Sequence, residues 1–215
     1  MKKFLTIFLS VLMMMGLLTT VTGAAEIGKA NDMLSESEVA AIIEEAFPEH
    51  NLATARSRNS VSAWENAENK TLVQSETRTL SSDIEVTYLK YSNDASAYIL
   101  STCNFYTNST SSGSGYTTTN TDIILTVPGL VGTMYVSSLD YTIYTSSYDK
   151  INSIGSVSDG SGTSGTKVLE RQQENSSGPA TARYSMVFEQ PLLGSYVPVT
   201  LKVYIGNNQR TYDVY

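Results

Sequence analysis

Residues 196–205 read YVPVTLKVYI, and this segment indicates the fold class of the chain more clearly than any other. Aliphatic side chains occupy every second position from Val197 to the end of the segment, with Tyr, Pro, Thr and Lys between them. Successive side chains of a β-strand point to opposite faces, so the alternation predicts a strand with one buried and one solvent-facing side. Pro198 has no N–H to donate, which places it at a sheet edge or a strand start.

The segments on both sides continue this pattern. Residues 183–189 alternate in the same way before the strand. After it, Asn207 and Asn208 predict a two-residue turn, because asparagine tolerates the positive φ angles that such turns need. The register of this turn places two side chains on the core side of a following strand and one charged side chain at its rim, namely Tyr212, Val214 and Arg210.

Short strands separated by clusters of Gly, Ser, Pro and Asn fill residues 72–215. This spacing is typical of an all-β domain made of two packed sheets. The sequence therefore predicts a mainly β protein, an antiparallel β-sandwich of about seven to nine strands, immunoglobulin-like or related. The further expected strands cover residues 84–90, 97–106, 117–127, 134–144, 150–157 and 167–173.

One short acidic amphipathic α-helix precedes the strands, at about residues 35–47. Ser35 and Glu38 have the spacing of a capping box, which satisfies free N–H groups at a helix start. Apolar residues then recur at helical spacing, with acidic residues on the opposite face. Pro48 ends the pattern, because proline disfavours helical geometry in the residue before it.

The helix belongs to an acidic N-terminal segment, residues 25–71. Its polar second half predicts either a linker or a frayed helix around Trp64. The helix itself has two possible docking sites, which are a partner molecule and the protein's own sandwich.

Residues 1–24 have the layout of a signal peptide. Lys2 and Lys3 precede an apolar run at 4–18, and small residues follow at the expected cleavage point. The run is shorter than the roughly 20 residues that span a bilayer, although an uncleaved membrane anchor is the alternative interpretation. No lipid-attachment cysteine or wall-sorting motif is found. The sequence predicts a secreted, extracellular protein that is not bound to the membrane after signal cleavage.

Composition narrows the possible partners. The net charge is −7 with a pI near 4.7, and removal of the signal peptide would change the charge to −9. Nucleic-acid binding depends on clustered Lys and Arg, so this class of partner is disfavoured. In general layout the chain is similar to small exported β-sandwich proteins of monoderm bacteria.

The residue types that most enzymes use are scarce. Cys103 is the only cysteine, so no intrachain disulfide forms, and its place in a strand predicts a small buried hydrophobe. His50 is the only histidine and is expected at the helix end. Zinc sites of the usual nitrogen and sulfur composition are therefore excluded. We expect no cofactor, no metal and no catalysis.

A hydrolase that uses two carboxylates is the remaining enzymatic alternative. Glycosidases can work with such a pair alone, and Asp122, Asp140 and Glu189 are its candidates. The pair would have to lie about 5 to 10 Å apart across a cleft. Otherwise each carboxylate is the polar half of an alternating strand.

A tyrosine-rich surface is the main candidate for binding. All 14 tyrosines lie between Tyr88 and Tyr215, and Tyr196 and Tyr204 share the solvent-facing side of their strand. Exposed tyrosines stack on sugars or fill protein interfaces, although tyrosine is also an ordinary strand former. The sequence predicts a secreted, non-catalytic protein that binds a polysaccharide or a surface protein. The alternative is a structural or accessory surface protein that docks through its acidic helix.

Overall fold

The computed structural model describes residues 33–50, 64, 70–109, 115–191 and 194–215, except for the side chains of residues 104–109. Residues Leu34–Tyr215 form one compact unit. The predicted signal peptide, residues 1–24, and most of the predicted linker lie outside the described residues.

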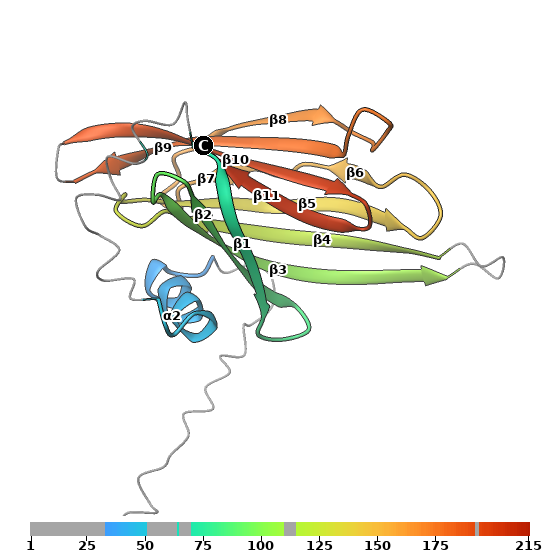
Figure 1. The fold of residues 1–215 in the computed structure, drawn as a ribbon, viewed down its shortest axis with the longest axis horizontal. Helices are drawn as coiled ribbons and strands as arrows, with labels where there is room; N and C mark the ends of the chain where they lie inside the picture. Colours follow the sequence, from blue (N-terminus) through green and yellow to red (C-terminus); the bar gives the residue numbers. More distant parts are fainter. Residues whose placement is uncertain (1–32, 51–63, 65–69, 110–114, 192–193) are drawn as a thin grey trace, which may run out of the picture. The chain divides into compact units, whose positions relative to one another are not determined.

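Two antiparallel sheets and one helix make up the described chain, so the prediction of a mainly β protein with one short helix is confirmed (Figure 1). The larger sheet has the strand order β1-β2-β3-β4-β5-β6, with β7 paired to β5, and the smaller has the order β11-β10-β9-β8. The elements are α2 (Glu36–Ala46), β1 (Leu72–Thr79), β2 (Ile84–Tyr91), β3 (Ser96–Ser109), β4 (Gly115–Thr126), β5 (Thr133–Tyr144), β6 (Lys150–Ser153), β7 (Val157–Ser158), β8 (Thr166–Arg171), β9 (Ala180–Gln190), β10 (Ser195–Gly206) and β11 (Gln209–Val214).

The strand count among the described residues is eleven, more than the sequence predicts. One reason is that the predicted strand 150–157 is two strands, β6 and β7. Between them Gly155 passes close to β5, where a Cβ on Gly155 would lie 1.5 Å from the Ser137 carbonyl oxygen. The other reason is β1, which is solvent-exposed on both faces and has no alternation to reveal it. Apart from β7, which pairs with β5, neighbouring strands in both sheets follow the order of the sequence, unlike the strands of the immunoglobulin fold.

Strand β10 has the alternation that the sequence predicts. Its aliphatic residues from Val197 to Ile205 are buried in the core shared by the two sheets. Asn207 and Asn208 have φ angles of 53° and 62°, and Gly206 pairs with Gln209 across the two-residue turn. β11 pairs with β10 only from Leu201 onward. Pro198 therefore lies where β10 has no hydrogen-bond partner in β11. Tyr212 and Val214 are buried, as predicted.

Trp64 is part of this core. Its side chain is 3% exposed, and its ring centroid lies 5.9 Å from that of Tyr91. The Nζ atom of Lys70 lies 3.6 Å from the centroid of the Trp64 ring. Burial lowers the pKa of Lys70 to about 8. The segment that the sequence predicts as a linker therefore supplies a core residue.

Helix α2 packs against the outer face of the larger sheet. The Ser35 hydroxyl accepts from the Glu38 N–H, and the Glu38 carboxylate accepts from the Ser35 N–H, so the predicted capping box is confirmed. The apolar side of the helix and the sheet beneath it form a second core cluster, made of Val39, Ile43, Ala46, Phe47, Val86, Tyr98, Leu100, Ile124 and Tyr135. The sequence allowed the helix to dock on a partner molecule or on the protein's own sandwich. In the structure it docks on the protein's own larger sheet.

We expect Ser35→Ala to lower the free energy of unfolding by about 1 kcal/mol, which is the usual cost of losing a helix N-cap. Because α2 shares a core with the sheet, this loss should shift the single unfolding transition of the whole protein. Urea unfolding measures it. Ser37→Ala is the comparison inside the same helix turn, because it removes a hydroxyl that lies 3.1 Å from Ser35 Oγ but leaves both hydrogen bonds of the capping box in place. A separate early transition for the helix would contradict cooperative docking.

Two fully buried tyrosines differ in their hydrogen bonding. The Tyr91 hydroxyl donates to Asp213 Oδ1 at 2.9 Å and accepts from the Val214 N–H at 2.7 Å. The Tyr184 hydroxyl is buried in the core and has no hydrogen-bond partner among the residues that the structure describes. Burial raises the pKa of both phenols, so both stay neutral at physiological pH.

Phenylalanine substitutions at these two tyrosines should have opposite effects. Tyr184→Phe removes an unsatisfied buried hydroxyl and is expected to raise the free energy of unfolding by about 1 kcal/mol. Tyr91→Phe removes the donor to Asp213 Oδ1 and one of the two acceptors of the Val214 N–H, which keeps its 2.9 Å bond to Asp213 Oδ1, and is expected to lower the free energy of unfolding by about 1 kcal/mol. Urea unfolding of the two variants provides the comparison. Equal effects of the same sign would contradict the assigned bonding.

Candidate functional site

Tyr196 and Tyr204 lie on the outer face of the smaller sheet but in different surroundings. Tyr196 is 71% exposed, whereas Tyr204 is half-buried. Burial raises the pKa of Tyr204, and Asp213 adds to this effect while Lys202 opposes it. The two rings are eight residues apart on one strand, which corresponds to roughly 27 Å at about 3.4 Å per residue. They do not form one stacking platform.

Exposed apolar side chains surround Tyr196. β9 places Glu189 opposite Tyr196 and Val187 opposite Pro198, while Val131 pairs with Glu189 on its other side through two backbone hydrogen bonds of 2.7 and 2.9 Å. Residues opposite each other in antiparallel strands point to the same face, so these side chains are contiguous. Val131 is 50% exposed and Val187 is 60% exposed. We call Val131, Val187, Tyr196 and Pro198 the Tyr196 patch.

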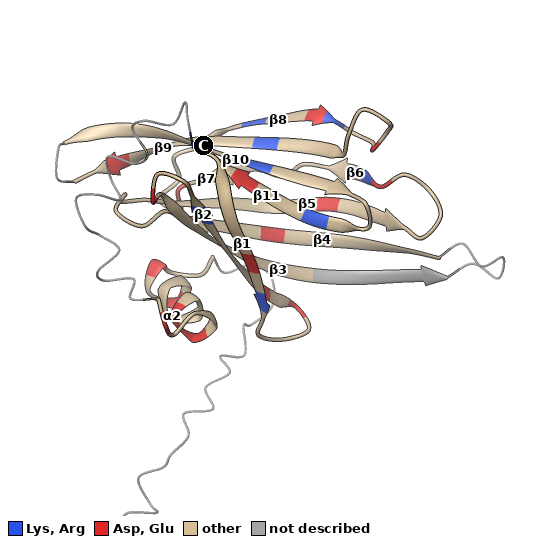
Figure 2. Cartoon of the chain, in the orientation of Figure 1, with Lys and Arg blue, Asp and Glu red and all other residues tan. Residues whose placement is uncertain are grey.

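Charged side chains separate the Tyr196 patch from Tyr204. Glu170 of β8 lies 3.3 Å from Arg183 Nε and 3.2 Å from Lys202 Nζ. Figure 2 shows these charges of both signs on β8, β9 and β10, in contrast to α2, which carries only acidic charges. The outer face of this sheet is therefore apolar at the Tyr196 end and polar toward Tyr204.

Only two of the three candidate carboxylates lie on one sheet: Asp122 and Asp140 share the outer face of β4 and β5, where Asn120 opposes Asp140. Asp122 accepts from the Ser138 N–H at 2.7 Å, and Asp140 accepts from the Asn152 amide at 3.2 Å, both in the larger sheet. Glu189 lies on the smaller sheet. Asp122 and Asp140 thus make local hydrogen bonds in their own sheet, and Glu189 has no part in that arrangement.

The outer side of β4, β5 and β6 presents a second surface, which is mainly polar. The Tyr116 and Tyr144 rings lie 5.7 Å apart, and the Thr118 and Thr142 hydroxyls are hydrogen-bonded at 3.0 Å. Asn152 donates to both Asp140 and Thr142. We call Tyr116, Thr118, Asp140, Thr142, Tyr144 and Asn152 the polar ladder. Of these residues the sequence predicts only Asp140 as a candidate, for a carboxylate pair, because the pairing of distant strands brings the six side chains together.

A groove of about 550 Å³ lies between α2 and the turn that joins β4 to β5. Glu36 and Glu44 line it from the helix. Residues 126–133 form its other wall, so Val131 belongs both to this wall and to the Tyr196 patch. The groove therefore adds two carboxylates next to an exposed apolar surface.

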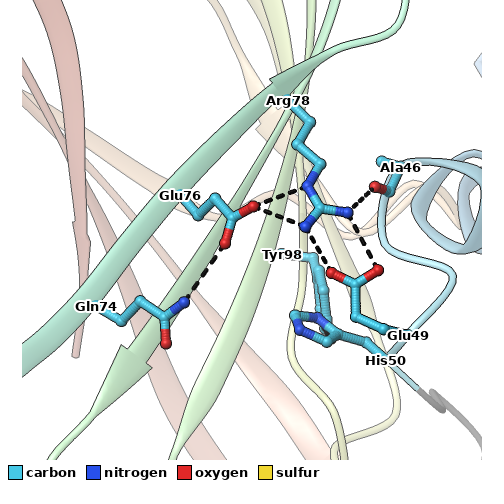
Figure 3. Close-up of polar contacts among 7 residues, drawn as sticks. All are labelled: Ala46, Glu49, His50, Gln74, Glu76, Arg78 and Tyr98. Atoms are coloured by element: carbon cyan, nitrogen blue, oxygen red, sulfur yellow. Dashed lines mark hydrogen bonds and ion pairs between the residues drawn. The ribbon is translucent and has the colours of Figure 1, made fainter.

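The C-terminal end of α2 is held by a network around Arg78 of β1 (Figure 3). The Arg78 guanidinium donates to the Ala46 carbonyl, to both carboxylate oxygens of Glu49 and to Glu76. Hydrogen bonding from Arg78 lowers the pKa of Glu49. His50 stacks on Phe47 with centroids 5.1 Å apart, and its Nδ1 lies 3.0 Å from the Tyr98 hydroxyl. These residues anchor the helix to the sheet.

Cys103 lies in a buried polar cluster between the sheets. As predicted, its side chain is buried, at 3% exposure. Arg210 donates to Cys103 Sγ, Thr121 Oγ1 and Tyr141 Oη at 3.1, 3.0 and 2.9 Å and forms an ion pair with Glu85 at 2.7 Å. The Arg210 side chain is only 7% exposed, so it is buried more deeply than the predicted rim position implies.

Within the described ranges, no cluster of His, Cys, Asp and Glu side chains is arranged to hold a metal ion. None of the helices among the described residues is long and apolar enough to cross a membrane. The chain matches no protein-family model, and no curated protein or solved structure shows significant similarity to it.

Proposed function

We propose that this chain is an exported, non-catalytic protein that binds a partner protein in the extracellular space. We further propose that its two sheets form a β-sandwich related to, but connected differently from, the immunoglobulin type. The N-terminal signal-peptide pattern supports export. The absence of a complete catalytic motif in the sequence supports a binding role.

The observation that carries this proposal is the Tyr196 patch. Isolated exposed apolar residues are normal, whereas a contiguous group of them indicates an interaction surface. Register places Val131, Val187, Tyr196 and Pro198 side by side. Glu189 is the polar group in their midst, whereas sugar recognition needs several hydrogen-bonding groups around an aromatic ring. The patch therefore fits a protein better than a glycan.

The acidic groove suggests the charge of that partner. Glu36 and Glu44 lie on its helical wall, and Val131 connects the groove to the Tyr196 patch. Electrostatic complementarity favours a partner that presents Lys or Arg beside an apolar segment. Binding should consequently weaken as the salt concentration rises.

The test is an affinity measurement on the immobilised exported chain. The probes are purified extracellular-matrix proteins, mucin, wall polysaccharide and peptidoglycan. We expect a protein probe to bind, and Val187→Asp and Tyr196→Ala each to weaken that binding at least tenfold, as for a buried interface anchor. Tyr148→Ala is the matched control, because Tyr148 is 53% exposed and lies outside the patch. Unchanged binding in both patch variants would exclude this surface.

The polar ladder favours a glycan as the second candidate ligand. Its two tyrosine rings offer stacking surface, and its hydroxyl, amide and carboxylate groups offer hydrogen bonds. For this alternative we expect mucin or a wall polysaccharide to be retained, and Tyr144→Ala to abolish retention while Tyr196→Ala does not. The reverse pattern would place glycan binding on β10.

A further inference from the structure

Strand β1 is an exposed edge of the larger sheet. It pairs with β2 along one side, and no strand among the described residues pairs with its other side. Six of its eight residues are exposed, and the remaining two, Glu76 and Arg78, are half-buried. An unpaired edge presents free N–H and C=O groups that another strand can join.

This edge carries only part of the usual protection against strand addition, namely two charged residues and one irregularity in its pairing. Its sequence, LVQSETRT, contains neither proline nor lysine, the residues that most often block edge pairing. The one irregularity in its pairing with β2 lies between Leu72 and Gln74, so residues 74–79 are regular. Leu72 and Val73 add exposed apolar side chains, at 39% and 58%, next to this regular part.

We propose that β1 pairs antiparallel with β1 of a second copy of this chain, about a two-fold axis at Thr77. A two-fold interface must be complementary to itself, so residues equally distant from the axis oppose each other. An axis at Thr77 places Glu76 opposite Arg78 of the second copy, and the two-fold symmetry repeats this pair. Each Glu76 already forms an ion pair with Arg78 of its own chain at 2.7 Å, so this register brings the two pairs side by side with charges of alternating sign. An axis at Glu76 or Arg78 would oppose like charges, which destabilises the pair.

The neighbouring register with its axis at Ser75 brings no opposite charges together. There, Glu76 faces Gln74 and Arg78 faces Leu72 of the second copy. Charge complementarity therefore selects the Thr77 register. The resulting dimer would join the larger sheets of the two copies edge to edge.

Single cysteine substitutions on β1 test this register. Ser75, Thr77 and Thr79 are all exposed and share one face of the strand. The natural cysteine, Cys103, is buried, so each introduced thiol is the accessible one. Only Thr77 faces itself across the axis, at a Cα separation of about 4.5 to 5.5 Å that permits a disulfide.

Under mild oxidation, we expect Thr77→Cys to form a disulfide-linked dimer. Ser75→Cys and Thr79→Cys, oxidised separately, should stay monomeric, because each thiol lies four residues, or roughly 14 Å, from its own copy. A mixture of these two variants should cross-link, because positions 75 and 79 oppose each other. Light scattering of the native chain should show a dimer that increases with concentration, and Glu76→Lys should weaken this dimer at least tenfold.

Three results would overturn the proposal. The first is a native chain that stays monomeric at its highest soluble concentration. The second is equal cross-linking of all three cysteine variants, which indicates random collision. The third is a native dimer in which Thr77→Cys gives no cross-link, which places the interface elsewhere.

Discussion

Asp149→Asn is expected to lower the free energy of unfolding by about 3 kcal/mol, although it changes neither the size nor the shape of the side chain. Asp149 is fully buried. Its Oδ1 accepts from the Tyr144 N–H at 2.8 Å and its Oδ2 accepts from the Asn208 N–H at 2.9 Å. Asparagine replaces one of these acceptors with an NH₂ group, so two donors face each other without water.

The position of Asp149 adds to this effect. Tyr144 ends a strand of the larger sheet, while Asn208 lies in the turn between β10 and β11 of the smaller sheet. The carboxylate therefore ties the two sheets together and holds a turn whose φ angles are positive. Urea unfolding followed by fluorescence measures the loss.

Asp122→Asn is the matched control for this prediction. Asp122 is half-buried, and the hydrogen bond from the Ser138 N–H uses its Oδ1. An asparagine oxygen can keep this bond while its NH₂ group points to water, so we expect a loss below about 1 kcal/mol. If the two substitutions lowered the free energy of unfolding by similar amounts, the two hydrogen bonds accepted by the Asp149 carboxylate would not explain its contribution to stability.

Arg210→Met is expected to lower the free energy of unfolding by about 3 kcal/mol. Methionine fills much of the same space but provides no donor for the Thr121 and Tyr141 hydroxyls or for the Glu85 carboxylate. Removing one partner from a buried ion pair commonly costs about 3 to 5 kcal/mol. The lower value is expected here, because Glu85 is 34% exposed and regains water.

Arg183→Met is the control for Arg210→Met. Arg183 forms an ion pair with Glu170 on the surface, and its side chain is 41% exposed. Surface pairs contribute about 0 to 1 kcal/mol, so urea unfolding should show a loss within that range. If Arg183→Met lowered the free energy of unfolding as much as Arg210→Met, burial would not explain how much each arginine contributes to stability.

Local sequence patterns predicted several elements correctly. The capping box at Ser35 and Glu38, the turn at Asn207 and Asn208 and the alternation of β10 each depend on residues close together in the chain. Strand β1 shows the limit of such patterns. An edge strand exposed on both faces needs no alternation, so β1 has no periodic signal and exists because β2 provides its hydrogen-bond partner.

The candidate binding surface was only partly predictable. Alternation placed Tyr196 on the solvent-facing side, and the same reasoning would have placed Val187 there, since it lies between the buried Met186 and Phe188. Val131 carried no such signal. It joins the patch because the turn after β4 bridges to β9, a contact between residues 58 positions apart in the sequence.

The sequence by itself determined the mainly β class, the helix and its cap, the final hairpin and the burial of Cys103, because these follow from periodicity and from the preferences of neighbouring residues. The tertiary structure decided where α2 docks, how deeply Arg210 is buried, which side chains join Tyr196 and that β1 has a neighbour on only one side among the described strands. These properties depend on contacts between distant segments, and the order in which strands pair, rather than any local pattern, creates those contacts.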